Sequence, residues 1–378
     1  MKNRNRILHF LLPGFLSICG ACGSAPVPAP VPAPIPAPLL VPAPAEEDAP
    51  DESFPYNGSL PDPDDLPVSS FDEIWGYLVS GREEALLTDL PLSDVGYFGA
   101  EVDSYGQLTD VPDQGKIAWF PGRAHLVVAC NSRSLTHFVL EPGSRARADL
   151  IAGLLAAAGP FDGLQIDFEL VPARDGEAFR SFLGELRRGL GDKMLTIALP
   201  ARTRPREDDV YNYRDIAPLV DRVLVMAYDE HWSSSEPGPI ASLEWCRSVA
   251  AHALGTVGPE KLIMGLPFYG RTWGNVQVFR AFFFSGIERI RAENKVKEVR
   301  REGGIPTFTY EVPTTVTVYY EDAYSLSARL DLYRSMGVRS AGFWSLGQET
   351  PAIWNLITLS GEPRVPPDRN TPGSVPPP

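Results

Sequence analysis

The sequence predicts an α/β fold, a (β/α)8 TIM barrel with a small α+β insertion between strands 7 and 8. Short apolar segments typical of strands alternate with amphipathic helical segments, which implies a parallel sheet. Eight such strands in one stretch of chain fit a closed barrel better than an open sheet. A doubly wound sheet is the alternative. It would require a phosphate-binding glycine turn, which the sequence lacks.

Composition limits the classes of function. The 378 residues are 44% hydrophobic and 22% charged, as in soluble globular proteins. A net charge of −14 argues against nucleic acid or an anionic membrane surface as partner, and an uncharged substrate fits better. The five histidines show no ligand spacing. We therefore expect no metal and no cofactor, and we expect a monomer.

The first 22 residues resemble a bacterial lipoprotein signal peptide. Three basic residues precede an apolar run at 7–18, which is too short to span a membrane. Small residues stand just before Cys22, which would become the lipidated amino terminus, although Cys19 occupies a position where such signals carry leucine. Plain secretion is the alternative. We expect export across the bacterial inner membrane, with a lipid anchor as the sole membrane contact in the cell envelope.

The remaining chain divides by composition. Residues 23–66 are rich in proline and alanine and then in acids, which predicts a disordered linker. Residues 67–360 form the predicted barrel domain, with the insertion at about 274–322. Residues 361–378 are proline-rich and predict a disordered tail.

Within the barrel domain, the elements are expected in this order. A capping-box pattern at 70–73 predicts a short helix over 74–78. The first three strands are expected at 94–101, 124–130 and 135–140, and the helix before the fourth at 146–158. Later strands are expected at 194–200, 222–229, 261–269 and 340–346, and later helices at 177–190, 213–220, 243–254 and 325–336. Inside the insertion we expect a helix at 286–301 and strands at 307–311 and 315–320.

The fourth strand, at 161–169, carries the predicted chemistry. Its period of two places Gln165, Asp167 and Glu169 on one side, with about 6.6 Å between successive polar side chains. Catalytic groups of parallel barrels lie at the carboxyl ends of the strands. Two neighbouring carboxylates repel each other, which raises one pKa and favours a general acid. Glu169 is the expected acid and Asp167 its partner. An ordinary strand end capped by acids is the alternative.

This segment resembles the D-G-x-x-x-D-x-E signature of family 18 glycoside hydrolases, which include chitinases and endo-N-acetylglucosaminidases. Asp162, Gly163, Asp167 and Glu169 match the four fixed positions. Gln165 stands where the family has Asp or Asn. This difference removes a possible charge beside Asp167, so the family's pH optimum is not carried over.

A second match lies at the end of the strand expected at 222–229. Met226, Tyr228 and Asp229 resemble the family's M-x-Y-D motif, which implies that the tyrosine and the aspartate contact the substrate's acetamido group. Segments 228–232 and 237–240 look most like the bacterial branch that contains spore cortex-lytic N-acetylglucosaminidases. With Glu169, Asp167, Tyr228 and Asp229 as catalytic residues, the expected substrate contacts are Trp344, Met226, Tyr97, Tyr269, Gln165 and Asp162.

The resemblance implies a retaining hydrolase in which the substrate's 2-acetamido oxygen attacks the anomeric carbon while Glu169 acts as acid and then base. The expected partner is an N-acetylglucosamine-containing polysaccharide. Peptidoglycan, chitin and N-glycan cores all satisfy this description, and anchorage in an envelope favours peptidoglycan. Two alternatives stay open: a catalytically weak or inactive chitinase-like carbohydrate-binding surface lipoprotein, which Gln165 favours, and a purely structural surface lipoprotein.

Overall fold

The computed structural model describes residues 62–275, 284–302 and 305–360. The predicted signal peptide with Cys22, nearly all of the predicted linker and the predicted tail lie outside these residues. Among the helices of the described segments, none combines the length and apolar character needed to cross a bilayer.

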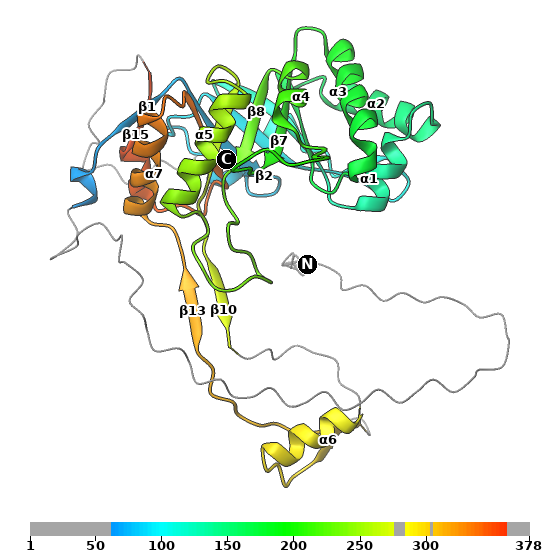
Figure 1. Cartoon of the computed structure of the whole chain (residues 1–378), viewed down its shortest axis with the longest axis vertical. Helices are drawn as coiled ribbons and strands as arrows, with labels where there is room; N and C mark the ends of the chain where they lie inside the picture. The colour runs from blue at the N-terminus through cyan, green and yellow to red at the C-terminus, as the bar shows by residue number, and fades with distance from the viewer. Residues whose placement is uncertain (1–61, 276–283, 303–304, 361–378) are drawn as a thin grey trace, which may run out of the picture. The chain divides into compact units, whose positions relative to one another are not determined.

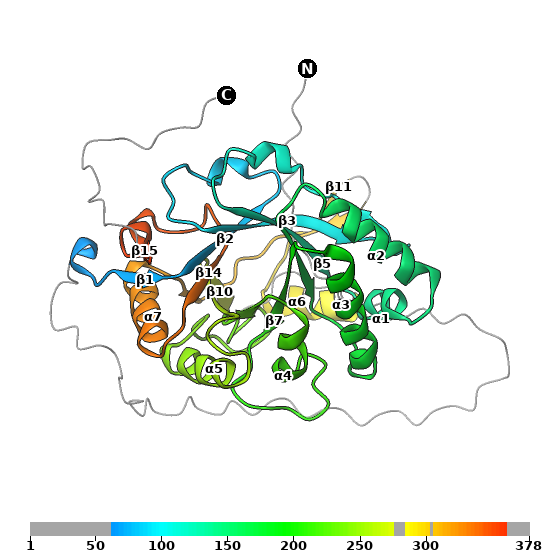
Figure 2. The same cartoon turned by 90° about the horizontal axis from the view of Figure 1, so that it is seen from above.

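Eight parallel strands close into a barrel (Figures 1 and 2), as the sequence predicts. They are β2 (Glu73–Val79), β3 (Asp94–Val102), β5 (Arg123–Cys130), β6 (Gly163–Phe168), β7 (Met194–Pro200), β8 (Arg222–Met226), β9 (Leu262–Pro267) and β14 (Ser340–Trp344). Neighbours in this order pair in parallel, and β14 pairs with both β9 and β2, which closes the ring. A short ninth strand, β4 (Leu108–Thr109), runs antiparallel to β3.

Helices cover the outside of the barrel (Figure 2). They are α1 (Arg133–Leu140), α2 (Arg145–Ala157), α3 (Gly176–Leu190), α4 (Tyr213–Ile216), α5 (Leu243–Thr256) and α7 (Ala323–Ser335). In α3, Phe179, Phe182 and Leu186 recur at helical spacing and are fully buried. Single 3-10 turns occur at η1 (Pro63–Asp65), η2 (Glu83–Ala85), η3 (Gln114–Ile117), η4 (Ala173–Asp175), η5 (Ala217–Leu219) and η6 (Pro351–Asn355). Outside the barrel, β1 (Ser69–Phe71) pairs with β15 (Ile357–Leu359).

The insertion occupies the predicted place in the chain, between the seventh strand, β9, and the eighth, β14. It contains β10 (Arg271–Gly274), α6 (Phe284–Glu293), β11 (Arg300–Glu302), β12 (Ile305–Thr307) and β13 (Val316–Tyr319). Strand β10 pairs antiparallel with β13, and β11 with β12. The helix is shorter than predicted, and the strand predicted at 307–311 is wrong, because β12 ends at Thr307.

Two predictions near the start of the barrel are wrong. Residues 74–78 lie in strand β2, because Trp75 and Tyr77 face the barrel interior while Ile74 and Leu78 pack outside it, a period of two. Residues 135–140 belong to helix α1, whose first turn is capped by Ser132. The two errors offset each other. The number of barrel strands is therefore as predicted, but the segment expected to be the first strand is the second.

The apolar core has two parts. The larger part lies between the strands and the surrounding helices. The smaller part fills the barrel, with Trp75, Tyr77, Val127, Ala198, Leu224 and Ile263 at its centre. At the amino end of the strands, Glu73 accepts hydrogen bonds from Arg123 and Arg222 at 2.7–2.9 Å. Burial opposes ionisation of Glu73, but these arginines outweigh it and lower its pKa to about 2.

Candidate active site

Asp167 in β6 and Glu169 just after this strand place two carboxylates at the carboxyl end of the barrel. Alternation along this strand turns Gln165 and Asp167 into the barrel, where both are buried. Glu169 follows the last residue of the strand and is solvent-exposed. The polar row expected from the sequence therefore runs up the interior wall and ends at the mouth, where parallel barrels carry their catalytic groups.

The two acids have raised pKa values. Burial, followed by the charge of Glu169, raises the pKa of Asp167 to about 8. Asp167 Oδ1 is buried and has no hydrogen-bond partner within the described segments. Although part of the Glu169 side chain is open to solvent, the surrounding protein partly desolvates its carboxyl group, and this desolvation, followed by the charge of Asp229, raises its pKa. Both acids therefore keep a proton to a higher pH than a free carboxyl group does, and the protonated form is the one that a general acid requires.

Beyond the end of β8, Tyr228 and Asp229 enter the same group. Tyr269 donates its hydroxyl hydrogen to Asp229. Arg271 Nη2 donates hydrogen bonds to both carboxylate oxygens of Asp229 at 2.7 Å. The Tyr228 and Tyr269 rings stand edge to face, with centroids 6.2 Å apart. Burial is the main cause that raises the pKa of Tyr228, and the charges of Asp167 and Glu169 add to it. Tyr228 therefore stays a protonated donor close to both acids.

Aromatic side chains form one wall of the mouth. The half-buried Trp344 lies 5.8 Å from the ring of Tyr77 and meets Phe98 edge-on at 5.0 Å. Met226 packs against the same interior cluster. Tyr77 and Phe98 are not among the residues expected from the sequence. Tyr77 was missed because β2 was assigned as a helix, although the alternation from Glu73 through Trp75 to Tyr77 was a usable signal.

Gln165 lies below this wall, inside the barrel. It has no solvent-exposed surface. Its Oε1 accepts a hydrogen bond from the Tyr77 hydroxyl at 2.7 Å, and its Nε2 donates to Thr196 Oγ1 at 3.1 Å. The amide is thus occupied by interior partners, and in this conformation it presents no surface to a ligand at the mouth.

Two other expected substrate contacts are not brought to the mouth. Tyr97 packs in the outer core, fully buried, and donates its hydroxyl hydrogen to Glu83. Its neighbour Phe98 takes the inward place, in register with Val127. Asp162 precedes β6 at the opposite, amino end of the barrel, where its Oδ2 accepts a hydrogen bond from the Ala124 backbone N–H at 2.8 Å. Asp162 joins two adjacent strands there.

The structure therefore brings together seven of the ten residues expected from the sequence in the barrel: Asp167, Glu169, Tyr228, Asp229, Tyr269, Met226 and Trp344. It adds Tyr77, Phe98 and Arg271, which the sequence did not single out. Within residues 62–275, 284–302 and 305–360, no three His, Cys, Asp or Glu side chains gather as a metal site would require. The chemistry available at this mouth is that of carboxyl and phenol groups beside an aromatic wall.

A parallel (β/α)8 barrel with an acidic pair at the end of one strand and aromatic rings at its mouth has the arrangement of a glycosidase. The match to a family model makes the identification specific. The chain belongs to family 18 of the glycosyl hydrolases, whose model matches residues 136–349. This range begins within α1 and extends past β14, so it includes Asp167 and Glu169.

Relatives of known name agree with this assignment. The chain is 32% identical over 243 residues to YdhD of Bacillus subtilis (strain 168), a proposed sporulation-specific glycosylase, with 60% of this chain and 57% of YdhD covered. It is 24% identical over 290 residues to the cortical fragment-lytic enzyme of Bacillus anthracis, covering 70% and 67%. The crystal structure of the Bacillus cereus spore cortex-lytic enzyme SleL matches with a TM-score of 0.61 and 22% identity over 78% of this chain and 76% of SleL. At that identity, the likeness to SleL supports the fold alone.

Proposed function

We propose that the chain is a retaining glycoside hydrolase that cleaves β-linked N-acetylglucosamine-containing glycans by substrate-assisted catalysis. The proposal rests on how the three carboxylates at the mouth differ in burial and in hydrogen-bond partners. Asp229 is held by Arg271 and Tyr269, and Asp167 is buried. Glu169 is the solvent-exposed one of the three, and its pKa, like that of Asp167, is raised. One free acid suits a reaction whose nucleophile is supplied by the substrate.

Each residue then has a chemical role. Glu169 protonates the departing glycosidic oxygen, and the 2-acetamido oxygen attacks the anomeric carbon to form an oxazolinium ion. The carboxylate of Glu169 next removes a proton from the water that opens this ring, with retained configuration. Asp167 orients the acetamido N–H and stabilises its positive charge. Tyr228 donates to the acetamido oxygen, and the face of Trp344 supports the sugar ring.

The test is the Glu169→Gln variant, which keeps the shape of the side chain and removes the acid. Loss of a general acid lowers kcat by about 10²–10⁴-fold. Glu177→Gln is the matched control, because Glu177 is an exposed carboxylate in the first turn of α3. Turnover of chitooligosaccharides by Glu169→Gln at the wild-type rate would refute the role of Glu169. Binding without product release by the wild type would favour the non-catalytic alternative.

Participation of the acetamido group has a separate test. A thiazoline that mimics the cyclised intermediate should inhibit competitively, and failure to inhibit would argue against this mechanism. For the substrate, the names of the Bacillus relatives favour peptidoglycan or its fragments. Mass spectrometry of products released from purified cell wall, compared with chitin, distinguishes the two glycans.

We also propose that the mature protein is attached to the cell envelope by a lipid on Cys22. The basis is the sequence before Cys22 alone. The test is palmitate labelling of the full-length chain in a bacterial host. Cys22→Ser should abolish labelling and release the protein from the membrane fraction, whereas Cys19→Ser should leave both unchanged. Labelling that depends on Cys19 would reassign the anchor, and an absence of labelling would indicate plain secretion.

A further inference from the structure

The turn that carries Glu169 is held from outside its own strand. The Tyr211 hydroxyl donates to the Phe168 carbonyl at 2.8 Å and accepts from the Val171 N–H at 2.8 Å. One oxygen therefore bridges the residues on either side of the pair Glu169–Leu170. Thr136 Oγ1 donates to the Leu170 carbonyl at 3.0 Å and adds a third fixed point.

Tyr211 is itself firmly placed. Its side chain lies in the core, with the ring edge-on to Phe179 at 6.3 Å. The guanidinium of Arg202 lies over the Tyr211 ring, 6.0 Å from its centroid. Asp209 holds Arg202 at 2.7 and 3.1 Å and also accepts from the Tyr211 N–H at 3.2 Å. These contacts with Phe179, Arg202 and Asp209 therefore fix the position of the Tyr211 hydroxyl.

Glu169, by contrast, has no support of its own. Within the described segments, no hydrogen bond or ion pair reaches its carboxylate. The position of the carboxyl group therefore depends on the backbone of the turn. A general acid must lie within hydrogen-bonding reach of the departing oxygen, and a displacement of about 1 Å is enough to lower a rate by about 100-fold.

We propose that Tyr211 is a positioning residue for Glu169, with its hydroxyl acting as a clamp on the turn 168–171. This inference rests on the proposed function of Glu169 as acid and base. Tyr211 does not touch the substrate in this scheme. The clamp needs a neutral phenol, because only the protonated hydroxyl donates to one backbone group while accepting from another. Burial keeps the phenol in that form.

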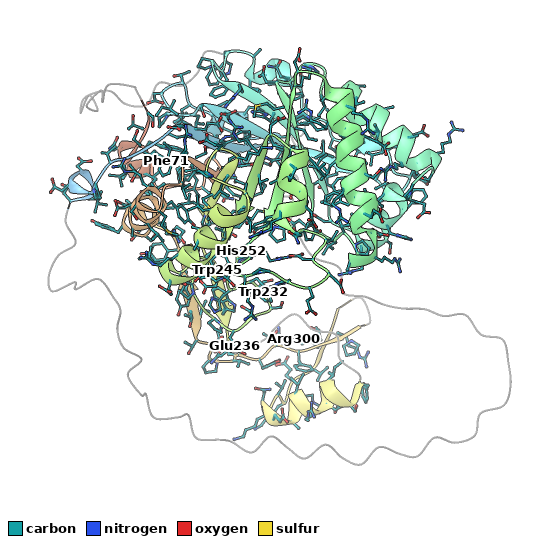
Figure 3. The ribbon with its side chains drawn as sticks, turned by 45° about the horizontal axis from the view of Figure 1, so that its top comes forward. Phe71, Trp232, Glu236, Trp245, His252 and Arg300 are labelled. Atoms are coloured by element: carbon teal, nitrogen blue, oxygen red, sulfur yellow. The ribbon has the colours of Figure 1, made fainter. Side chains whose placement is uncertain are left out.

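The chain supplies a matched control. Tyr213 lies two residues further on, is buried, and donates its hydroxyl hydrogen to the Pro200 carbonyl at 2.7 Å. Its ring faces that of His252 on α5, which Figure 3 labels. Tyr211→Phe and Tyr213→Phe thus each remove one buried hydroxyl bonded to the backbone at the end of a barrel strand. Tyr211→Phe alone affects the strand that carries Glu169.

The experiment measures kcat, KM and the pH profile of kcat for the wild type and both variants on a chitooligosaccharide. For Tyr211→Phe we expect kcat to fall about 10–100-fold, KM to stay within about twofold, and the basic limb of the profile to move. For Tyr213→Phe we expect the wild-type values, with a similar loss in Tm. Equal kcat values and profiles for the two variants would overturn the positioning role.

Amide hydrogen exchange adds a readout that does not depend on turnover. The Val171 N–H donates to Tyr211, so its protection should fall in Tyr211→Phe and persist in Tyr213→Phe. A wild type that releases no product would defeat the proposed function, and the exchange at Val171 would still test the clamp. Unchanged protection in Tyr211→Phe would overturn the clamp whether or not the enzyme is active.

Discussion

Arg271 and Asp229 form a two-point ion pair at the mouth of the barrel. Arg271 Nη2 lies 2.7 Å from both carboxylate oxygens of Asp229, and its Nε lies 2.9 Å from Oδ1. Asp229 has a positive φ of 58°, a left-handed conformation in which aspartate is tolerated. After burial, the charge of Asp229 is the cause that raises the pKa of Glu169. Arg271 therefore limits how strongly the charge of Asp229 acts on Glu169.

The first prediction concerns this electrostatic link. In Arg271→Gln, the negative charge of Asp229 is no longer balanced, so the pKa of Glu169 should rise and the basic limb of the kcat/KM profile should move to higher pH. In Asp229→Asn the charge is absent, and the limb should move to lower pH. Arg271→Lys, which keeps the charge but loses the two-point geometry, is the control. A shift in the same direction in the Gln and Asn variants would contradict the link.

Much of the fold was predictable because repeated periods dominate the sequence. The alternation of strands and helices gave the barrel, and the interruption after β9 gave the insertion. Residues 74–78 were predicted to be helical because the pattern of Ser70 and Glu73 resembles a helix cap. In the structure, Glu73 instead accepts hydrogen bonds from Arg123 and Arg222 at the amino end of the barrel. That role depends on contacts between distant strands, which no local pattern contains.

The positions of site residues could be predicted where a residue ends a strand. They were harder to predict where the register of a strand decides which side chain faces the barrel interior. Glu169, Tyr228 and Trp344 follow directly from strand ends. Tyr97 turned out to face the outer core because its register partner is Leu126, while the next residue pairs with the interior Val127. Arg271 lies two residues beyond Tyr269, and its pairing with Asp229 joins the start of β10 to the segment after β8, which is far from it in the sequence.

A second prediction follows from the buried acid. The pKa of Asp167 is about 8 in the folded protein and 3.8 in its ordinary state. The folded state therefore binds the proton more tightly, and the stability contribution of Asp167 is complete below pH 3.8 and is lost as the pH rises towards 8. Asp167→Asn, which stays neutral, should gain stability relative to the wild type across this window, by up to about 1.4 kcal/mol per pH unit. Urea unfolding of both proteins at several pH values measures it, and a pH-independent difference would count against the raised pKa.

The third prediction concerns Glu73, whose pKa is lowered in the folded protein, whereas that of Asp167 is raised. The folded pKa of Glu73 is about 2, below its ordinary value of 4.5. Its stability contribution is therefore present above pH 4.5 and lost as the pH falls towards 2. Glu73→Gln should cost about 1.5–3 kcal/mol at neutral pH, because Arg222 loses its carboxylate partner while Arg123 keeps Asp94, and this cost should shrink in acid.

A surface carboxylate provides the control for Glu73. Glu260 pairs with Arg339 in solvent, so Glu260→Gln should cost at most about 1 kcal/mol. Because Glu73 lies at the amino end of the strands, the folded fraction of Glu73→Gln should retain the wild-type kcat. Denaturant unfolding and kinetics on the same preparation measure both quantities. An equal cost for the two variants would show that the buried cluster contributes no more than a surface pair.

The last prediction separates the aromatic wall from ordinary core packing. Trp344 is half-buried beside Tyr77 and Phe98 at the mouth. Trp354 instead lies edge-on to the stacked rings of Phe268 and Phe343 outside the barrel, at 5.7 and 5.8 Å. Trp344→Ala should remove a sugar-binding surface worth about 1.5–3 kcal/mol, which corresponds to a fall in kcat/KM of about 10–150-fold. Trp354→Ala should lower Tm and leave KM unchanged. Kinetics and thermal unfolding of both variants distinguish the two roles. If both variants lost stability and neither changed KM, Trp344 would be a packing residue, and the support for the sugar ring would have to come from another side chain at the mouth.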